Sequence, residues 1–129
     1  MTSPIPPQMA SYALAALRIV AALLFIEHGT QKLLAFPIAP PGGAVPAMFT
    51  LYWFAGVLEI FVGLMVLVGF FARPAAFVLS GMMAVAYFMA HFPRSFWPVA
   101  NGGDAAILFC FVFLYIAAAG PGPFSINRR

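Results

Sequence analysis

Polar side chains that could do chemistry gather in two places in this sequence. The first place lies within two helical turns and contains a carboxylic acid, an imidazole, an amide and an amine. These are Glu27, His28, Gln31 and Lys32, respectively. Glu27 and Gln31 are four residues apart, as are His28 and Lys32, so on a helix they form two adjoining polar faces. Such groups bind polar ligand atoms and exchange protons.

The second place combines Tyr87 and His91, again four apart, with Asn101 and Asp104. Asp104 opens the last apolar segment, where it is expected to cap a helix and complement its dipole. Antiparallel segments would bring both places to one membrane face. Ionisable residues inside membrane spans are costly and usually belong to functional sites. The sequence therefore predicts a polar ligand pocket at this membrane face. Its candidate residues are Glu27, His28, Gln31, Lys32, Tyr87, His91, Asn101 and Asp104.

The composition restricts the kind of protein that could present these groups. Of 129 residues, 64% are hydrophobic and 7% are charged, whereas soluble domains contain about 45–50% apolar and about 25% charged residues. A small soluble domain could not bury so much apolar surface. The net charge of +3 comes from scattered basic residues, so binding of nucleic acid is not supported. An integral membrane protein is expected.

Four segments are long and apolar enough for membrane spans, which need about 20 residues as a helix. They cover about residues 9–36, 47–70, 74–91 and 104–119, between stretches rich in proline and glycine. Their continuous hydrophobicity favours helices over a barrel. The sequence therefore predicts a single domain over residues 1–129, folded as an antiparallel bundle of four transmembrane helices.

The orientation is predicted from the basic residues that flank the spans. Arg73, Arg128 and Arg129 lie on the side of both termini, against Arg94 and Lys32 on the other side. Basic residues favour the cytoplasmic side. Both termini are therefore expected in the cytoplasm, with the chain in the bacterial inner (plasma) membrane.

Two charges lie deep inside predicted spans, Arg18 in the first and Glu59 in the second. Gly56 and Gly63 flank Glu59 on its own face, where small residues allow a neighbouring helix to approach closely. Because unpaired buried charges are costly, we expect an intramembrane ion pair between Arg18 and Glu59 that holds the helices together. In the alternative interpretation, Glu59 accepts or relays a proton within a ligand cavity.

Several classes of site are absent from the sequence. It contains no glycine-rich phosphate loop, Cys-x-x-Cys pair, His-Glu-x-x-His motif or nucleophile elbow. The single Cys110 lies in an apolar run and is interpreted as a small buried hydrophobic residue. No metal is expected. A b-type haem held by His28 and His91 is a further hypothesis, for which two histidines are thin support.

The order of several motifs resembles the DoxX family. The motifs are Arg18, His28-Gly29-x-Gln31-Lys32-Leu33, Phe54-Ala55-Gly56-x-Leu58-Glu59-Ile60, Gly69-x-x-x-Arg73-Pro74, Ala84-Val85-Ala86-Tyr87-Phe88, Asn101-Gly102-Gly103-Asp104 and Gly120-Pro121-Gly122-Pro123. The resemblance implies a small four-helix membrane protein. The family takes its name from a subunit of an archaeal quinone-reducing system that oxidises thiosulfate, and relatives associate with membrane redox or sulfur-stress proteins. The resemblance supplies no catalytic residues.

The leading hypothesis is a small membrane subunit linked to quinone-dependent redox or to sulfur and oxidative-stress chemistry. His91, Tyr87 and His28 would contact the quinone carbonyls, Asp104 or Glu27 would exchange protons, and a partner complex or diffusing substrate would supply electrons. The alternative is a non-catalytic scaffold that binds lipid and a partner complex. A cavity at the polar residues would favour the quinone-linked subunit. Salt bridges among those residues that fill the space would favour the scaffold. A homo-oligomer is compatible with either function. A transporter is a further hypothesis, and a transporter with only four helices per chain would need to oligomerise.

Overall fold

The computed structural model describes residues 6–40 and 42–127, and this part of the chain is helical without strands. Its long helices are α1 (Pro7–Leu34), α2 (Leu51–Val68), α3 (Ala72–Ala86) and α5 (Asp104–Ala119). Between α3 and α5 the chain forms a π-helical turn, η1 (Tyr87–His91), a 3-10 turn, η2 (Phe92–Arg94), and the short helix α4 (Pro98–Asn101).

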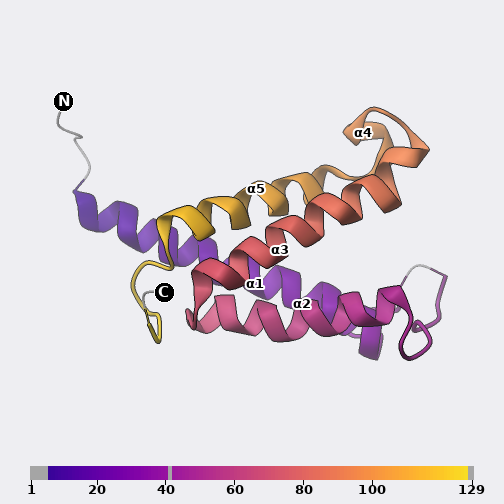
Figure 1. The fold of residues 1–129 in the computed structure, drawn as a ribbon, viewed down its shortest axis with the longest axis horizontal. Coiled ribbons are helices and arrows are strands. Elements are labelled where there is room, and N and C mark those ends of the chain that lie inside the picture. The colour runs from indigo at the N-terminus through magenta and orange to yellow at the C-terminus, as the bar shows by residue number, and fades with distance from the viewer. Residues whose placement is uncertain (1–5, 41, 128–129) are drawn as a thin grey trace.

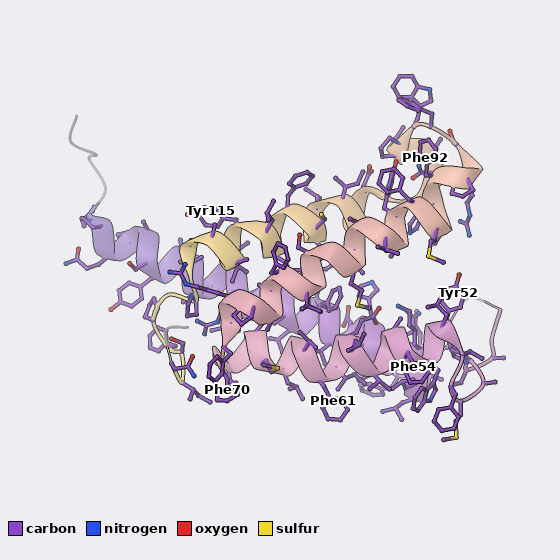
Figure 2. The ribbon with its side chains drawn as sticks, viewed as in Figure 1. Tyr52, Phe54, Phe61, Phe70, Phe92 and Tyr115 are labelled. Atoms are coloured by element: carbon purple, nitrogen blue, oxygen red, sulfur yellow. The ribbon has the colours of Figure 1, made fainter. Side chains whose placement is uncertain are left out.

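Three of these helical segments are long and apolar enough to cross a membrane: Pro7–Leu34, Leu51–Val68 and Ala72–Arg94. The helix Asp104–Ala119 is apolar but shorter. Many large aromatic side chains point outward from the helices and are exposed (Figure 2). Such a surface needs an apolar solvent, because apolar patches of this extent are rare on soluble monomers. The labelled examples are Tyr52, Phe54, Phe61, Phe70, Phe92 and Tyr115.

The helix ends follow local sequence signals. Proline occupies the first position of α1, where its missing N–H costs nothing. Thr50 caps α2, its side chain accepting a hydrogen bond from the Trp53 N–H at 3.4 Å. Gly69 ends α2 with a φ of +71°, and a Cβ there would lie 2.1 Å from Cβ of Ser125. The turn between α2 and α3 therefore requires glycine for both backbone conformation and space.

The long helices form two pairs, α1 with α2 and α3 with α5 (Figure 1). The pairs lie close together near the turn between α2 and α3 and diverge toward the end that carries α4 (Figure 1). Between the two pairs, Phe25 of α1 packs edge-on against Phe113 of α5, with ring centroids 5.2 Å apart. Because the pairs diverge, the C-terminal ends of α1 and α3 lie apart. The α1/α2 pair and the α3/α5 pair are called the two arms of the molecule below.

Small residues set the contact between α1 and α2. A Cβ at Gly63 would lie 2.8 Å from Cγ1 of Ile26, and one at Gly29 would lie 2.7 Å from Cγ1 of Ile60. These distances are too short for real side chains, so the two helices can approach this closely only through glycine. A Cβ at Gly56 would lie 3.0 Å from Cγ of Leu33, so the expectation that Gly56 and Gly63 admit a neighbouring helix is confirmed.

The start of α5 differs from the expectation. Gly103 is the N-cap residue, and no side chain caps the helix by a hydrogen bond. Asp104 is instead the first helical residue, with its side chain exposed. The prediction that Asp104 caps the helix is therefore wrong. Its carboxylate still lies at the positive end of the helix dipole, which favours an acidic residue there.

Candidate functional site

The predicted pocket residues lie on the two diverging arms. Glu27, His28, Gln31 and Lys32 belong to α1, whereas the others lie along η1, α4 and the start of α5. Within the described residues, no hydrogen bond or ion pair joins the two groups. Instead of one polar cluster, the structure forms a hydrogen-bonded loop, a charged cavity and an apolar groove.

The hydrogen-bonded loop centres on Asn101, which is 1% exposed. Its Nδ2 donates to Oη of Tyr87 at 3.1 Å and to the Ser95 carbonyl at 2.9 Å, and its Oδ1 accepts from the Gly103 N–H at 2.8 Å. Nδ1 of His91 lies 3.0 Å from the Asn101 carbonyl. Both polar atoms of the amide are thus satisfied within the chain. This arrangement braces the connection between α3 and α5.

The charged cavity lies between α2 and α3 and has a volume of about 280 Å³. Nζ of Lys32 and Oε1 of Glu59 form an ion pair at its wall. Glu59 is 1% exposed, and its Oε2 has no hydrogen-bond partner in the described part of the chain. Tyr52 and Met83 are among the lining residues. Glu59 therefore lines a largely apolar cavity with one of its carboxylate oxygens buried and unpaired.

Arg18 is completely buried and holds the C-terminal segment instead of a carboxylate. Its Nη1 donates to the carbonyls of Pro121 and Pro123, the second at 3.1 Å, and its Nη2 donates to the Phe124 carbonyl at 2.8 Å. Proline has no N–H and interrupts regular structure, so carbonyls in a Gly-Pro-Gly-Pro stretch need outside donors. That stretch was the sequence signal for this contact.

The predicted ion pair between Arg18 and Glu59 is therefore wrong, because each residue has another partner. The physical reason is the register of the first two helices. Glu59 lies opposite Gly29, where a Cβ would be 3.0 Å from Cβ of Glu59. Arg18 precedes Gly29 by eleven residues, about 16 Å along a helix that rises 1.5 Å per residue. Lys32 is within reach of Glu59 and Arg18 is not.

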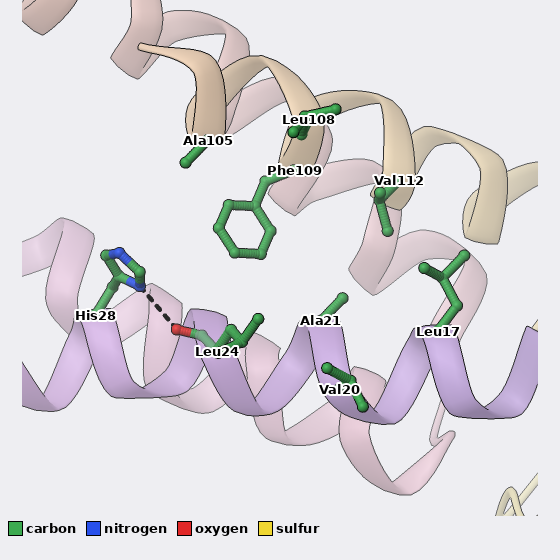
Figure 3. A pocket seen from close by; sticks show the side chains of 9 residues that line it. All are labelled: Leu17, Val20, Ala21, Leu24, His28, Ala105, Leu108, Phe109 and Val112. Atoms are coloured by element: carbon green, nitrogen blue, oxygen red, sulfur yellow. Dashed lines mark hydrogen bonds between the residues drawn. The ribbon is translucent and has the colours of Figure 1, made fainter. Parts of the chain in front are cut away.

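The apolar groove lies between α1 and α5 and has a volume of about 410 Å³. Aliphatic side chains and Phe109 line it, and His28 lies at one end (Figure 3). Nδ1 of His28 lies 2.7 Å from the Leu24 carbonyl. A carbonyl oxygen only accepts, so Nδ1 carries the proton, and Nε2 is an acceptor in the neutral ring and a donor in the imidazolium. The ring also meets Phe109 edge-on, with centroids 6.0 Å apart.

The remaining candidates have other surroundings. Gln31 donates from Nε2 to the Ala39 carbonyl at 3.3 Å, which ties down the segment after α1. Glu27 and Asp104 are exposed and line neither the groove nor the charged cavity. Cys110 is half-buried, and its carbonyl accepts a hydrogen bond from Oγ of Ser80 at 2.7 Å. Across the described residues, no group of three or more His, Cys, Asp or Glu could hold a metal ion.

Comparison with known proteins identifies the family. The sequence model of the DoxX family matches residues 13–92. An uncharacterized protein of Haemophilus influenzae is 43% identical over 121 residues, which cover 92% of this chain and 90% of that protein. An uncharacterized membrane protein of Mycobacterium tuberculosis is 27% identical over 127 residues, covering 88% and 78% of the two chains. No solved structure matches the chain.

The family match covers more than half of the chain, and the Haemophilus influenzae protein is similar over nearly its whole length. The apolar helices agree with this assignment, because three of them could cross a membrane. The chain is an integral membrane protein and belongs to the DoxX family.

Proposed function

We propose that this protein is a small membrane subunit that binds a lipophilic quinone in the groove between α1 and α5. The observation that carries the proposal is the composition of that groove. It offers about 410 Å³ lined by apolar side chains, with the single imidazole of His28 at one end. Binding sites for lipophilic molecules combine an apolar cavity with a few polar groups that orient the ligand. The ring would lie beside His28 and the tail along Leu17 and Val20.

The hydrogen-bonding capacity of His28 fits both redox states of such a ligand. A bound quinone supplies two-electron carrier chemistry coupled to proton uptake. With Nδ1 committed to the Leu24 carbonyl, Nε2 of the imidazolium donates to a carbonyl, and Nε2 of the neutral ring accepts from a hydroxyl. The same nitrogen thus holds or releases a proton at the ligand oxygen. Electrons would come from a partner membrane protein or a diffusing reductant.

The proposed setting is the bacterial plasma membrane, with all four long helices crossing it as an antiparallel bundle and both termini in the cytoplasm. The shortest helix, α5, has 16 residues. At 1.5 Å per residue it spans about 24 Å, less than the roughly 30 Å of a hydrocarbon core. Locally thinned bilayer would accommodate this difference. Reporter fusions at the two termini test the orientation, and periplasmic signals from both would reverse it.

A second candidate function is a non-catalytic accessory subunit that binds lipid and a partner complex. The observation that favours it is the loop around Asn101. Tyr87, His91 and Asn101 satisfy one another and border neither of the two cavities described above. Their role in the fold then needs no ligand, and an acyl chain would occupy the groove.

A titration separates the two functions. A short-chain ubiquinone analogue is added to the protein in lipid nanodiscs, with empty nanodiscs as the control for partitioning. We expect saturable binding that His28→Ala weakens by about tenfold, since one charge-assisted hydrogen bond is lost. His91→Ala is the matched control, because His91 bonds to the Asn101 carbonyl away from the groove. If only His91→Ala weakens saturable binding, the quinone ring binds at the loop around Asn101 and not in the groove. Absence of saturable binding would support the accessory subunit.

A further inference from the structure

The cavity between α2 and α3 is separate from the groove of the proposed function. It has a volume of about 280 Å³, and its lining residues are apolar apart from the Lys32–Glu59 pair and Tyr52. We propose that it binds a neutral lipophilic alcohol or phenol, whose hydroxyl group donates a hydrogen bond to Oε2 of Glu59.

The need for a donor follows from the hydrogen bonds of Glu59. Oε1 is bound to Lys32, whereas Oε2 has no partner among the described residues although the residue is 1% exposed. An ionised carboxylate only accepts hydrogen bonds. A buried acceptor left without a donor destabilises the folded state, so a ligand that brings one hydroxyl group gains more here than an isosteric ether.

The charge balance of the cavity selects a neutral ligand. Lys32 and Glu59 carry opposite charges and cancel. An amine cation or a carboxylate anion would leave one net charge in an apolar space, which is strongly unfavourable. A ligand with only carbonyl oxygens could accept from the remaining N–H groups of Lys32, but it would bring no donor to Oε2 of Glu59. The remaining chemistry is an apolar body that carries a hydroxyl group.

Small residues on the cavity wall keep this space open. Gly81 lies on the α3 side, and a Cβ built there would meet no atom within 4 Å. Ala55 on α2 and Ala86 on α3 line the same cavity. Glycine inside a helix lowers its stability relative to alanine, and here no close packing contact requires it. A larger side chain at position 81 would fill the cavity without disturbing the backbone.

The test measures binding of matched hydroxyl and ether probes to the protein in lipid nanodiscs by calorimetry, with empty nanodiscs subtracted. The probes are 4-hexylphenol with 4-hexylanisole, and 1-decanol with decyl methyl ether. We expect at least about tenfold tighter binding of one or both hydroxyl compounds than of the matching ether. Preference for the phenol or for the alcohol identifies which source of the hydroxyl group fits. Equal affinity for hydroxyl compound and ether, or no saturable binding, would overturn the proposal.

Two variants and one control variant locate the site. Gly81→Leu should abolish binding of the hydroxyl compounds without lowering the melting temperature. Val78→Leu, an exposed position of the same helix outside the cavity lining, should leave binding unchanged. Equal binding in the Gly81→Leu variant would refute the location. In Glu59→Gln the amide oxygen can still accept from Lys32, and the NH₂ group that replaces Oε2 donates to a hydroxyl oxygen or an ether oxygen alike, so the preference for the hydroxyl compound should be lost. The proposed quinone site is tested separately by His28→Ala, so either site can fail alone.

Discussion

The two openings between the helix pairs differ in how their polar groups are held. In the α1/α5 groove, the single imidazole bonds to a carbonyl four residues earlier on its own helix. In the α2/α3 cavity, Lys32 and Glu59 come from different helices and pair across the α1/α2 contact. The first arrangement needs only one helix, whereas the second exists only after two helices have packed.

Because of this difference, we expect the polar groups of the two openings to affect ligand binding and protein stability to different extents. A histidine satisfied by its own helix can be removed at little structural cost, so evolution can tune it for a ligand. A buried ion pair between helices cannot lose one member without leaving an uncompensated charge. We therefore expect changes at His28 to alter binding, and loss of one member of the Lys32–Glu59 pair to alter folding. Three measurements can break or sharpen this contrast.

The largest effect is expected from Lys32→Met. Removing the ammonium leaves Glu59 buried and unpaired, which should destabilise the protein by about 3–5 kcal/mol. The double variant Lys32→Met/Glu59→Leu should recover most of this loss. Thermal melts in detergent measure the change, and His28→Ala serves as the groove control with an expected loss of less than about 1 kcal/mol. A double variant less stable than Lys32→Met would contradict the pairing.

A smaller effect is expected from filling the groove. Ala105 is exposed and lines the groove on α5, so Ala105→Phe should occupy the space proposed for the ligand. Binding of the ubiquinone analogue should weaken by about tenfold, equivalent to about 1.4 kcal/mol. The melting temperature should stay the same, and binding of 4-hexylphenol in the charged cavity should not change. Unchanged quinone affinity would exclude the groove.

The smallest effect is expected from Cys110→Ala. Cys110 lies in the contact between α3 and α5, with its Sγ 3.6 Å from Oγ of Ser80, and it lines neither opening. Its carbonyl, which accepts the stronger hydrogen bond from Ser80, is retained in the variant. Stability should fall by no more than about 1 kcal/mol, and both ligands should bind as before. A changed ligand affinity would mean that the two openings are coupled through this contact.

Local properties of the chain were predictable from its sequence. Hydropathy predicts apolar helices, and the spacing of the glycines predicts where α1 and α2 touch. Tyr87, His91 and Asn101 were expected near one another, and they do form one network. These features depend on local composition and helical periodicity, and both can be obtained from the sequence alone.

By itself, the sequence determined that the chain is an apolar, helical membrane protein of the DoxX family. Tertiary structure alone decided that Lys32 pairs with Glu59, that Arg18 holds the C-terminal carbonyls, and that the polar residues divide between two arms. The physical reason is that these outcomes depend on the register of α1 against α2 and on the divergence of the two helix pairs. Both are set by the packing of many side chains across helices, which no local pattern of residues specifies.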